Sequence, residues 1–183
     1  NLNENAPKEN IEFLRESVNG SDVTKIKGLF ATLNERNRNG RLYTKEIFER
    51  EVNRLQENIE KGSVLGELEH PASTSINYEN AVIKIDSLKS DGKYVEGVAS
   101  VIPAGKGLLI EGLIKVGAQI GISSRGTGSL SEDKTVKTDY SLVTYDLVAD
   151  PSNYGSYMNA IEESKEFIIE SNGDLKAAYN ELD

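Results

Sequence analysis

The spacing of apolar residues changes along this chain, and that change limits the fold more than any other feature. Between Thr44 and Gly62 apolar residues recur at helical spacing, which predicts a helix capped by the first residue and ended by the second. Residues 64–68, 81–88 and 94–102 then read as strands, and Ser-Asp-Gly-Lys before the last is typical of a hairpin turn. The regular strand–helix alternation of a doubly wound fold is missing. We therefore predict an α+β fold that is mostly antiparallel.

The flanking segments carry weaker patterns, but each still favours one kind of element. Residues 11–18 have the spacing of a short helix, and the chain after Pro151 reads as helical with a break at Gly173. The remaining predictions are strands at 23–33, 119–124 and 136–148, a helix at 106–116, and a Gly-rich loop at 125–128.

These patterns divide the chain into three parts. Residues 1–22 form a lead-in with the short helix, 23–160 form the main domain, and 161–183 form an acidic helical C-terminal segment. The last part holds seven acidic residues and two lysines, a net charge of −5 out of −9 for the whole chain. It is either the solvated face of a helix or a separable segment.

Composition excludes several classes of function. The chain has no cysteine and one histidine, so disulfides, a thiol nucleophile and a zinc site with nitrogen and sulfur ligands are not expected. We expect neither a metal nor another cofactor. A net charge of −9 argues against a nucleic-acid partner, and no apolar run approaches the roughly 18 residues of a membrane span.

Three separate places could carry chemistry. His70 precedes a proline at the predicted end of a strand, and Ser123 and Ser124 end a short apolar strand before the Gly-rich stretch. Asp146 lies within an apolar strand, where an unpaired carboxylate is costly to bury. Each also has a simpler explanation, as a surface histidine, a flexible loop and a carboxylate that faces water. A serine hydrolase needs a nucleophile, a base and a group that orients the base, and here the base must be His70.

Four segments in this order resemble the prohead core serine proteases of large tailed bacteriophages, which are capsid maturation proteases. They are residues 37–43, 66–71, 123–128 and 146–152. The family is similar in fold to the herpesvirus capsid protease, which implies a mainly antiparallel β-barrel surrounded by helices. The resemblance also implies an enzyme that cuts scaffold and capsid proteins inside the immature head. The cut typically follows a glutamate that lies two positions beyond an aliphatic residue.

Carried over to this sequence, the resemblance implies a role for each candidate. His70 is the general base, and Ser123 is the nucleophile because its spacing from Gly121 looks closest to the family pattern; Ser124 is the reserve. Asp146 is the third member of the triad, with Asp150 as its reserve. By position only, Arg125 and Gly126 are candidates for stabilising the oxyanion.

The same resemblance implies the partners and the location. Scaffold and capsid proteins are the expected substrates, and the expected place is the assembling prohead in the host cytoplasm. Self-cleavage is also expected, and residues 161–163 and 168–170 both match the aliphatic-x-Glu pattern. The sequence leaves open whether the chain forms a homodimer.

Two alternatives remain from other classes of protein. The stretch from Glu35 to Glu46 partly matches the twelve-residue EF-hand loop, with Gly40 at its sixth position, so a calcium-binding module is one alternative. Its three arginines and one lysine repel a dication, and a strand is predicted where an EF-hand needs a helix. The other alternative is a catalytically silent capsid-assembly scaffold protein built on the protease fold.

Overall fold

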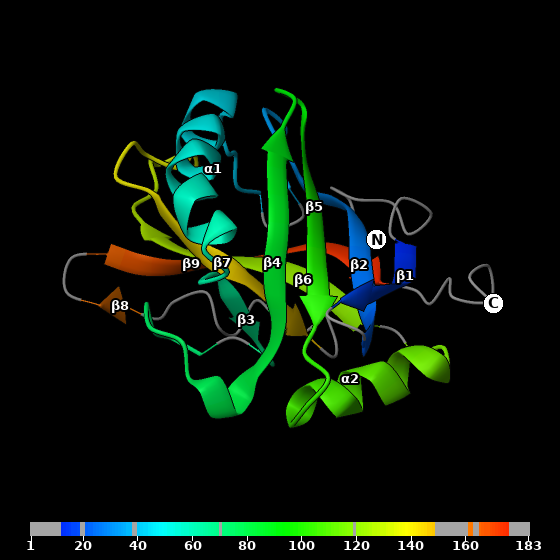
Figure 1. Ribbon diagram of the computed structural model, residues 1–183. Helices are drawn as coiled ribbons and strands as arrows, with labels where there is room; N and C mark the ends of the chain where they lie inside the picture. The colour runs from blue at the N-terminus through cyan, green and yellow to red at the C-terminus, as the bar shows by residue number, and fades with distance from the viewer. Residues whose placement is uncertain are drawn as a thin grey trace.

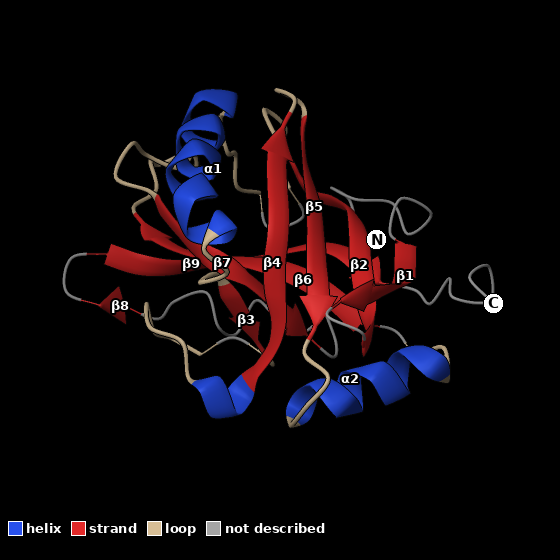
Figure 2. Cartoon of the chain, in the orientation of Figure 1, coloured by secondary structure: helices blue, strands red, loops and turns tan. Residues whose placement is uncertain are grey.

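The structure is a computed structural model, and it describes residues 12–18, 21–37, 40–69, 71–118, 120–148, 161–162 and 165–175. Side chains are described within these ranges from residue 23 to residue 148. This part of the chain forms an α+β fold with two antiparallel sheets and two α-helices (Figures 1 and 2). The elements are β1 (Glu12–Val18), β2 (Ser21–Thr32), α1 (Lys45–Glu60), β3 (Leu65–Glu67), the 3-10 helix η2 (Tyr78–Asn80), β4 (Ala81–Ser90), β5 (Tyr94–Val101), α2 (Lys106–Lys115), β6 (Ile120–Gly128), β7 (Ser141–Val148), β8 (Ile161–Glu162) and β9 (Lys165–Leu175).

The first sheet has the strand order β1-β2-β5-β4-β3. Its β4–β5 hairpin forms because the Asp91 carboxylate accepts the N–H groups of Lys93 and Tyr94, at 2.9 and 2.7 Å. Gly92 follows with φ +90°, a conformation that favours glycine. The hairpin expected from the sequence is thus confirmed.

The second sheet has the order β7-β6-β9-β8, so β6 is paired along both of its edges. β6 runs antiparallel to β7 on one side and to β9 on the other. In Figure 1 these strands cross behind the long β4–β5 hairpin. The strand that carries the two candidate serines therefore lies in the interior of its sheet.

The core lies between the two sheets. Phe30 from β2 and Tyr145 from β7 have ring centroids 5.2 Å apart and are fully buried, and Ile85 of β4 and Ile122 of β6 belong to the same apolar cluster. An isolated parallel bridge between Leu68 and Leu147 links the β3 edge of the first sheet to β7. Within the described ranges the strands form two sheets and no closed barrel.

Both α-helices were predicted by the sequence. The Thr44 hydroxyl accepts the N–H of Ile47 at 3.4 Å at the start of α1, and Gly62 has φ +73° just after the helix ends. α1 lies against β4, and α2 lies under the β4–β5 end of the first sheet (Figure 1). None of the described helices is both long and apolar enough to span a bilayer.

Three sequence-based predictions of local structure are wrong. Residues 12–18 form strand β1, because three apolar residues in so short a segment suit a strand as well as a helix once β2 offers a partner. The Gly-rich stretch 125–128 is the second half of β6, since β7 and β9 pair with it on both sides. The described part of the acidic C-terminal segment is β8 and β9 instead of helix, and β9 joins the sheet beside β6.

Candidate active site

The two candidate serines occupy opposite faces of β6. Side chains alternate along a strand, so Ser123 shares a face with Arg125, and Ser124 points the other way. The cross-strand partner of Ser124 is Tyr145, which packs on Phe30 in the core. Ile122 and Leu147 on this side of the sheet also belong to the apolar core, and burial raises the pKa of Tyr145. Ser123 is therefore the serine that lies on the polar face of β6.

That polar face holds a buried cluster of three charged side chains. Asp146 of β7 is the cross-strand partner of Ser123 and is completely buried. The Arg125 guanidinium donates through Nη2 to Asp146 Oδ1 and to Glu67 Oε2, at 3.0 Å each, and its Nε lies 2.9 Å from Asp146 Oδ2. Charges with 0–1% side-chain exposure are stable only when they are paired, and here each carboxylate contacts the same guanidinium.

The segment before position 70 lies along β7. The Glu67 N–H donates to Asp146 Oδ1 at 2.9 Å, and the Glu69 N–H donates to the Leu147 carbonyl at 2.7 Å. This close approach needs Gly66, where an added Cβ would lie 2.0 Å from the Tyr145 carbonyl oxygen.

The segment after position 70 is held by Arg125. Its Nη1 donates to the carbonyl of Pro71 at 3.3 Å and to that of Ser73 at 3.0 Å. Glu69 has φ +65°, a left-handed conformation that is uncommon for a residue other than glycine and that often marks functional sites. The residues on both sides of position 70 are thus anchored to the strands that carry Ser123 and Asp146.

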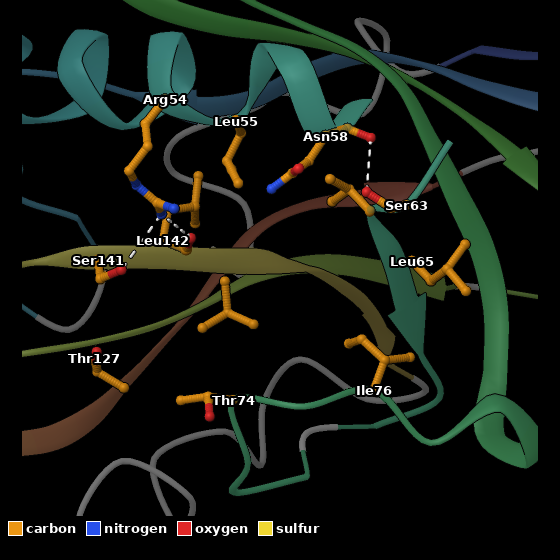
Figure 3. Close-up of a pocket in the computed structure, with 12 residues that line it drawn as sticks. Arg54, Leu55, Asn58, Ser63, Leu65, Thr74, Ile76, Thr127, Ser141 and Leu142 are labelled. Atoms are coloured by element: carbon orange, nitrogen blue, oxygen red, sulfur yellow. Dashed lines mark hydrogen bonds between the residues drawn. The ribbon is translucent and has the colours of Figure 1, made fainter. Parts of the chain in front are cut away.

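A pocket of about 300 Å³ lies on the same face of β6. Thr127, two residues beyond Arg125, lines it together with Thr74, which follows one of the carbonyl acceptors of Arg125 (Figure 3). Leu55 of α1 and Leu142 of β7 give it apolar walls, and Arg54 is the charged residue at its edge. A pocket of this size could hold a side chain of a bound peptide.

Comparisons with known proteins identify the family of this chain. Residues 7–166 match the family model described as prohead core protein serine protease. The chain belongs to this family. It is 32% identical over 165 residues to the prohead core protein protease of Enterobacteria phage T4, covering 86% of this chain and 78% of that protein. It is also similar to the structure of the bacteriophage T4 capsid assembly protease gp21, with a TM-score of 0.67 and 29% identity over 75% of this chain and 95% of that one. The family resemblance read from the sequence is confirmed.

The family assignment leaves the individual site residues as predictions. The structure brings Ser123 and Asp146 together as cross-strand partners and places Ser124 on the core side. His70 and Asp150 lie outside the described residues. Gly126 packs against the ring of Tyr140, and a Cβ added at this position would lie 2.6 Å from that ring.

Glu67 is the site residue that sequence reasoning missed. The available signal was a charge in an apolar strand, the argument already applied to Asp146. Glu67 has such a position, but Arg125 was expected in a loop, so its ion pair with Glu67 could not be predicted from the sequence.

The EF-hand-like stretch does not lie between two helices. Strand β2 precedes it and α1 follows it, so it lacks the first helix of an EF-hand. Gly40 donates to the Asn37 carbonyl at 2.8 Å in a tight turn. The structure shows no group of three or more acidic, histidine or cysteine residues that could hold a metal ion among the residues it describes.

Proposed function

We propose that this chain is a serine endopeptidase in which Ser123 is the nucleophile, His70 the general base and Asp146 the carboxylate that orients the base. The observation that carries the proposal is the register Ser123–Asp146 on the polar face of β6, with the residues on both sides of position 70 anchored to the same two strands. Membership of a protease family supports it independently. The rival choice of Ser124 is disfavoured because that residue lies opposite core residue Tyr145.

The proposed chemical steps are those of a serine protease. Ser123 Oγ attacks the scissile carbonyl while the imidazole takes its proton, and the same imidazole protonates the leaving amine. Water then releases the acyl-enzyme with the imidazole again as the base. Asp146 Oδ1 accepts from both Arg125 Nη2 and the Glu67 N–H, whereas Oδ2 lies 2.9 Å from Arg125 Nε; we assign Oδ2 to the base.

We further propose that the substrates are phage scaffold and capsid proteins, cut after glutamate inside the assembling prohead in the host cytoplasm. The names of the T4 relatives, which refer to the prohead core and to capsid assembly, support this setting. The relation to the herpesvirus protease barrel belongs to the same proposal, and the Leu68–Leu147 bridge, which joins one edge of each sheet, is consistent with it.

Self-cleavage is part of the proposal, and the register of β9 selects one bond. Ser171 pairs with Ser123 and Glu170 with Ser124, so the backbone between residues 170 and 171 runs beside the two candidate serines. The other aliphatic-x-Glu match ends at Glu163, which lies outside the described residues, and Glu162 before it pairs with β9. We therefore expect self-cleavage after Glu170.

The test compares wild type with Ser123→Ala and Ser124→Ala in two assays. A fluorophosphonate probe should label wild type and Ser124→Ala and leave Ser123→Ala unlabelled, while intact mass after incubation should show loss of residues 171–183 in the same two proteins. The control Glu170→Gln should keep the label and lose the cut. Labelling of Ser123→Ala would move the nucleophile to another residue, and absence of both label and cleavage in wild type would favour the silent scaffold protein.

A further inference from the structure

We propose that Arg125 and Glu67 are positioning residues, which hold the segment around His70 against the face of β6 and β7 that carries Ser123 and Asp146. The inference rests on the proposed function, since it takes His70 as the base. It differs from the oxyanion role that the sequence position of Arg125 suggested, because here Arg125 acts on the enzyme itself and never touches the substrate.

The hydrogen-bond donors of Arg125 contact both the segment around position 70 and the carboxylates of the site. Nη1 donates to the carbonyls of Pro71 and Ser73, and Nη2 donates to the carboxylates of Glu67 and Asp146. Each Nη carries two hydrogens, so all four have an acceptor within the described residues. The guanidinium therefore connects both sides of position 70 to both strands of the site.

Glu67 completes the connection from the other side. Its Oε2 accepts from Arg125 and its own N–H donates to Asp146, while its Oε1 accepts from Asn80 Nδ2 at 3.3 Å. The same Asn80 amide donates to the Leu68 carbonyl at 2.9 Å, and Asn80 Oδ1 accepts from Lys106 Nζ at 2.7 Å. The chain just before position 70 is thus fixed by side chains as well as by its backbone pairing with β7.

Only an arginine can make this set of contacts. The planar guanidinium presents its donors as a fork, which reaches two carbonyls on one side and two carboxylates on the other. A lysine in its place keeps the charge but has three donors on a single nitrogen, too few for four acceptors that surround the group. Arg125→Lys therefore removes the connection to Pro71 and Ser73 while leaving the buried carboxylates a cation.

The chain offers a direct probe, because it contains one histidine. Protein labelled with ¹³C and ¹⁵N in histidine gives the signals of a single imidazole ring, which report on position 70 alone. We would compare this signal in Arg125→Lys, Glu67→Gln and Arg36→Lys, all in a Ser123→Ala background so that the chain stays intact. Arg36 is the control, because it also donates to two carbonyls, those of Gly40 and Asp133, and to the Asp133 carboxylate, and none of these acceptors belongs to the site.

We expect the imidazole signal of Arg125→Lys and Glu67→Gln to move toward the random-coil position and to broaden, and that of Arg36→Lys to stay unchanged. With Ser123 restored, cleavage of a peptide with the sequence of residues 165–175 should lose on the order of 10²-fold in kcat with KM unchanged, as for a reacting group displaced by about 1 Å. Glu67→Gln preserves size and is the second variant if Arg125→Lys does not fold.

The outcomes separate this inference from the proposed function. An unchanged imidazole signal in either folded variant overturns the inference, and so does a rise in KM with kcat preserved, since that would place Arg125 at the substrate. The imidazole signal could depend on Arg125 and Glu67 while the protein with Ser123 cleaves no peptide. That result would support the positioning role and refute the protease mechanism.

Discussion

Replacement of Gly66 by alanine gives the sharpest test of how the site is assembled. An added Cβ would lie 2.0 Å from the Tyr145 carbonyl oxygen, and 2.7 Å from Ile83 Cγ1. Carbon–oxygen contacts below 3.0 Å essentially do not occur, so β3 and β7 must separate by about 1 Å. The carbonyl is backbone and cannot rotate away. The substitution therefore acts on the junction between the two sheets.

The expected loss of stability follows from the contacts at that junction. A shift of about 1 Å breaks the Glu67 N–H bond to the Asp146 carboxylate, worth about 1.5–3 kcal/mol, and the Glu69 N–H bond to Leu147, worth about 1 kcal/mol. Overpacking adds about 1–3 kcal/mol. We expect Gly66→Ala to lower the free energy of unfolding by about 3.5–7 kcal/mol, a large part of the total for a domain of this size.

Urea denaturation followed by far-UV circular dichroism measures this change, since the chain has no tryptophan to follow. Gly112→Ala is the control, because Gly112 lies exposed in α2 with no atom within 4 Å of an added Cβ. It should raise stability by about 0.5–1 kcal/mol. A free energy of unfolding for Gly66→Ala within about 0.5 kcal/mol of wild type, at an unchanged m value, would refute the argument that β3 must touch β7 here.

Three further predictions concern stability away from the junction. Burial opposes ionisation of Asp86, but hydrogen bonds from Ser100, Lys25 and Lys84 outweigh this effect and lower the pKa below 3.8. The ionised carboxylate therefore stabilises the fold above pH 3.8, and this stabilisation is lost as the pH falls through the pKa of the folded protein. Urea midpoints at about pH 7 and about pH 2 should therefore show a deficit in Asp86→Asn that shrinks on acidification; a constant deficit would contradict this. Thr44→Ala should cost about 1 kcal/mol by thermal unfolding through loss of the α1 cap. Among the described residues the Tyr145 hydroxyl is buried without a hydrogen-bond partner, so Tyr145→Phe should unfold at a temperature equal to or above that of wild type.

The sequence predicted those elements whose cause is local. α1 follows from a cap at Thr44 and an apolar face at helical spacing, and the β4–β5 hairpin follows from Asp91 and Gly92. Segments 12–18 and 165–175 were predicted as helix because their strand character depends on partners distant in the chain, β2 and β6. Intrinsic preference cannot anticipate such pairing.

The candidate site divides in the same way. Ser123 and Asp146 could be named from residue types and from the family resemblance, and their pairing across β6 and β7 required only the register. The function of Arg125 could not be named, since its acceptors come from a loop at 71–73 and from β3, about 50 residues earlier in the chain. A long side chain with many donors is assigned by its acceptors, and those are known only once the fold is known.

The pairing of β9 with β6 has a consequence for when such an enzyme can act. A peptide that docks by adding a strand to β6 finds both edges taken, so it must first displace β9. Because β9 is tethered to the same chain, it competes at an effective concentration in the millimolar range. Substrate proteins in dilute solution do not displace β9, whereas substrate proteins confined in a closed shell at a comparable, millimolar concentration can displace it. Proteolysis would then begin with confinement.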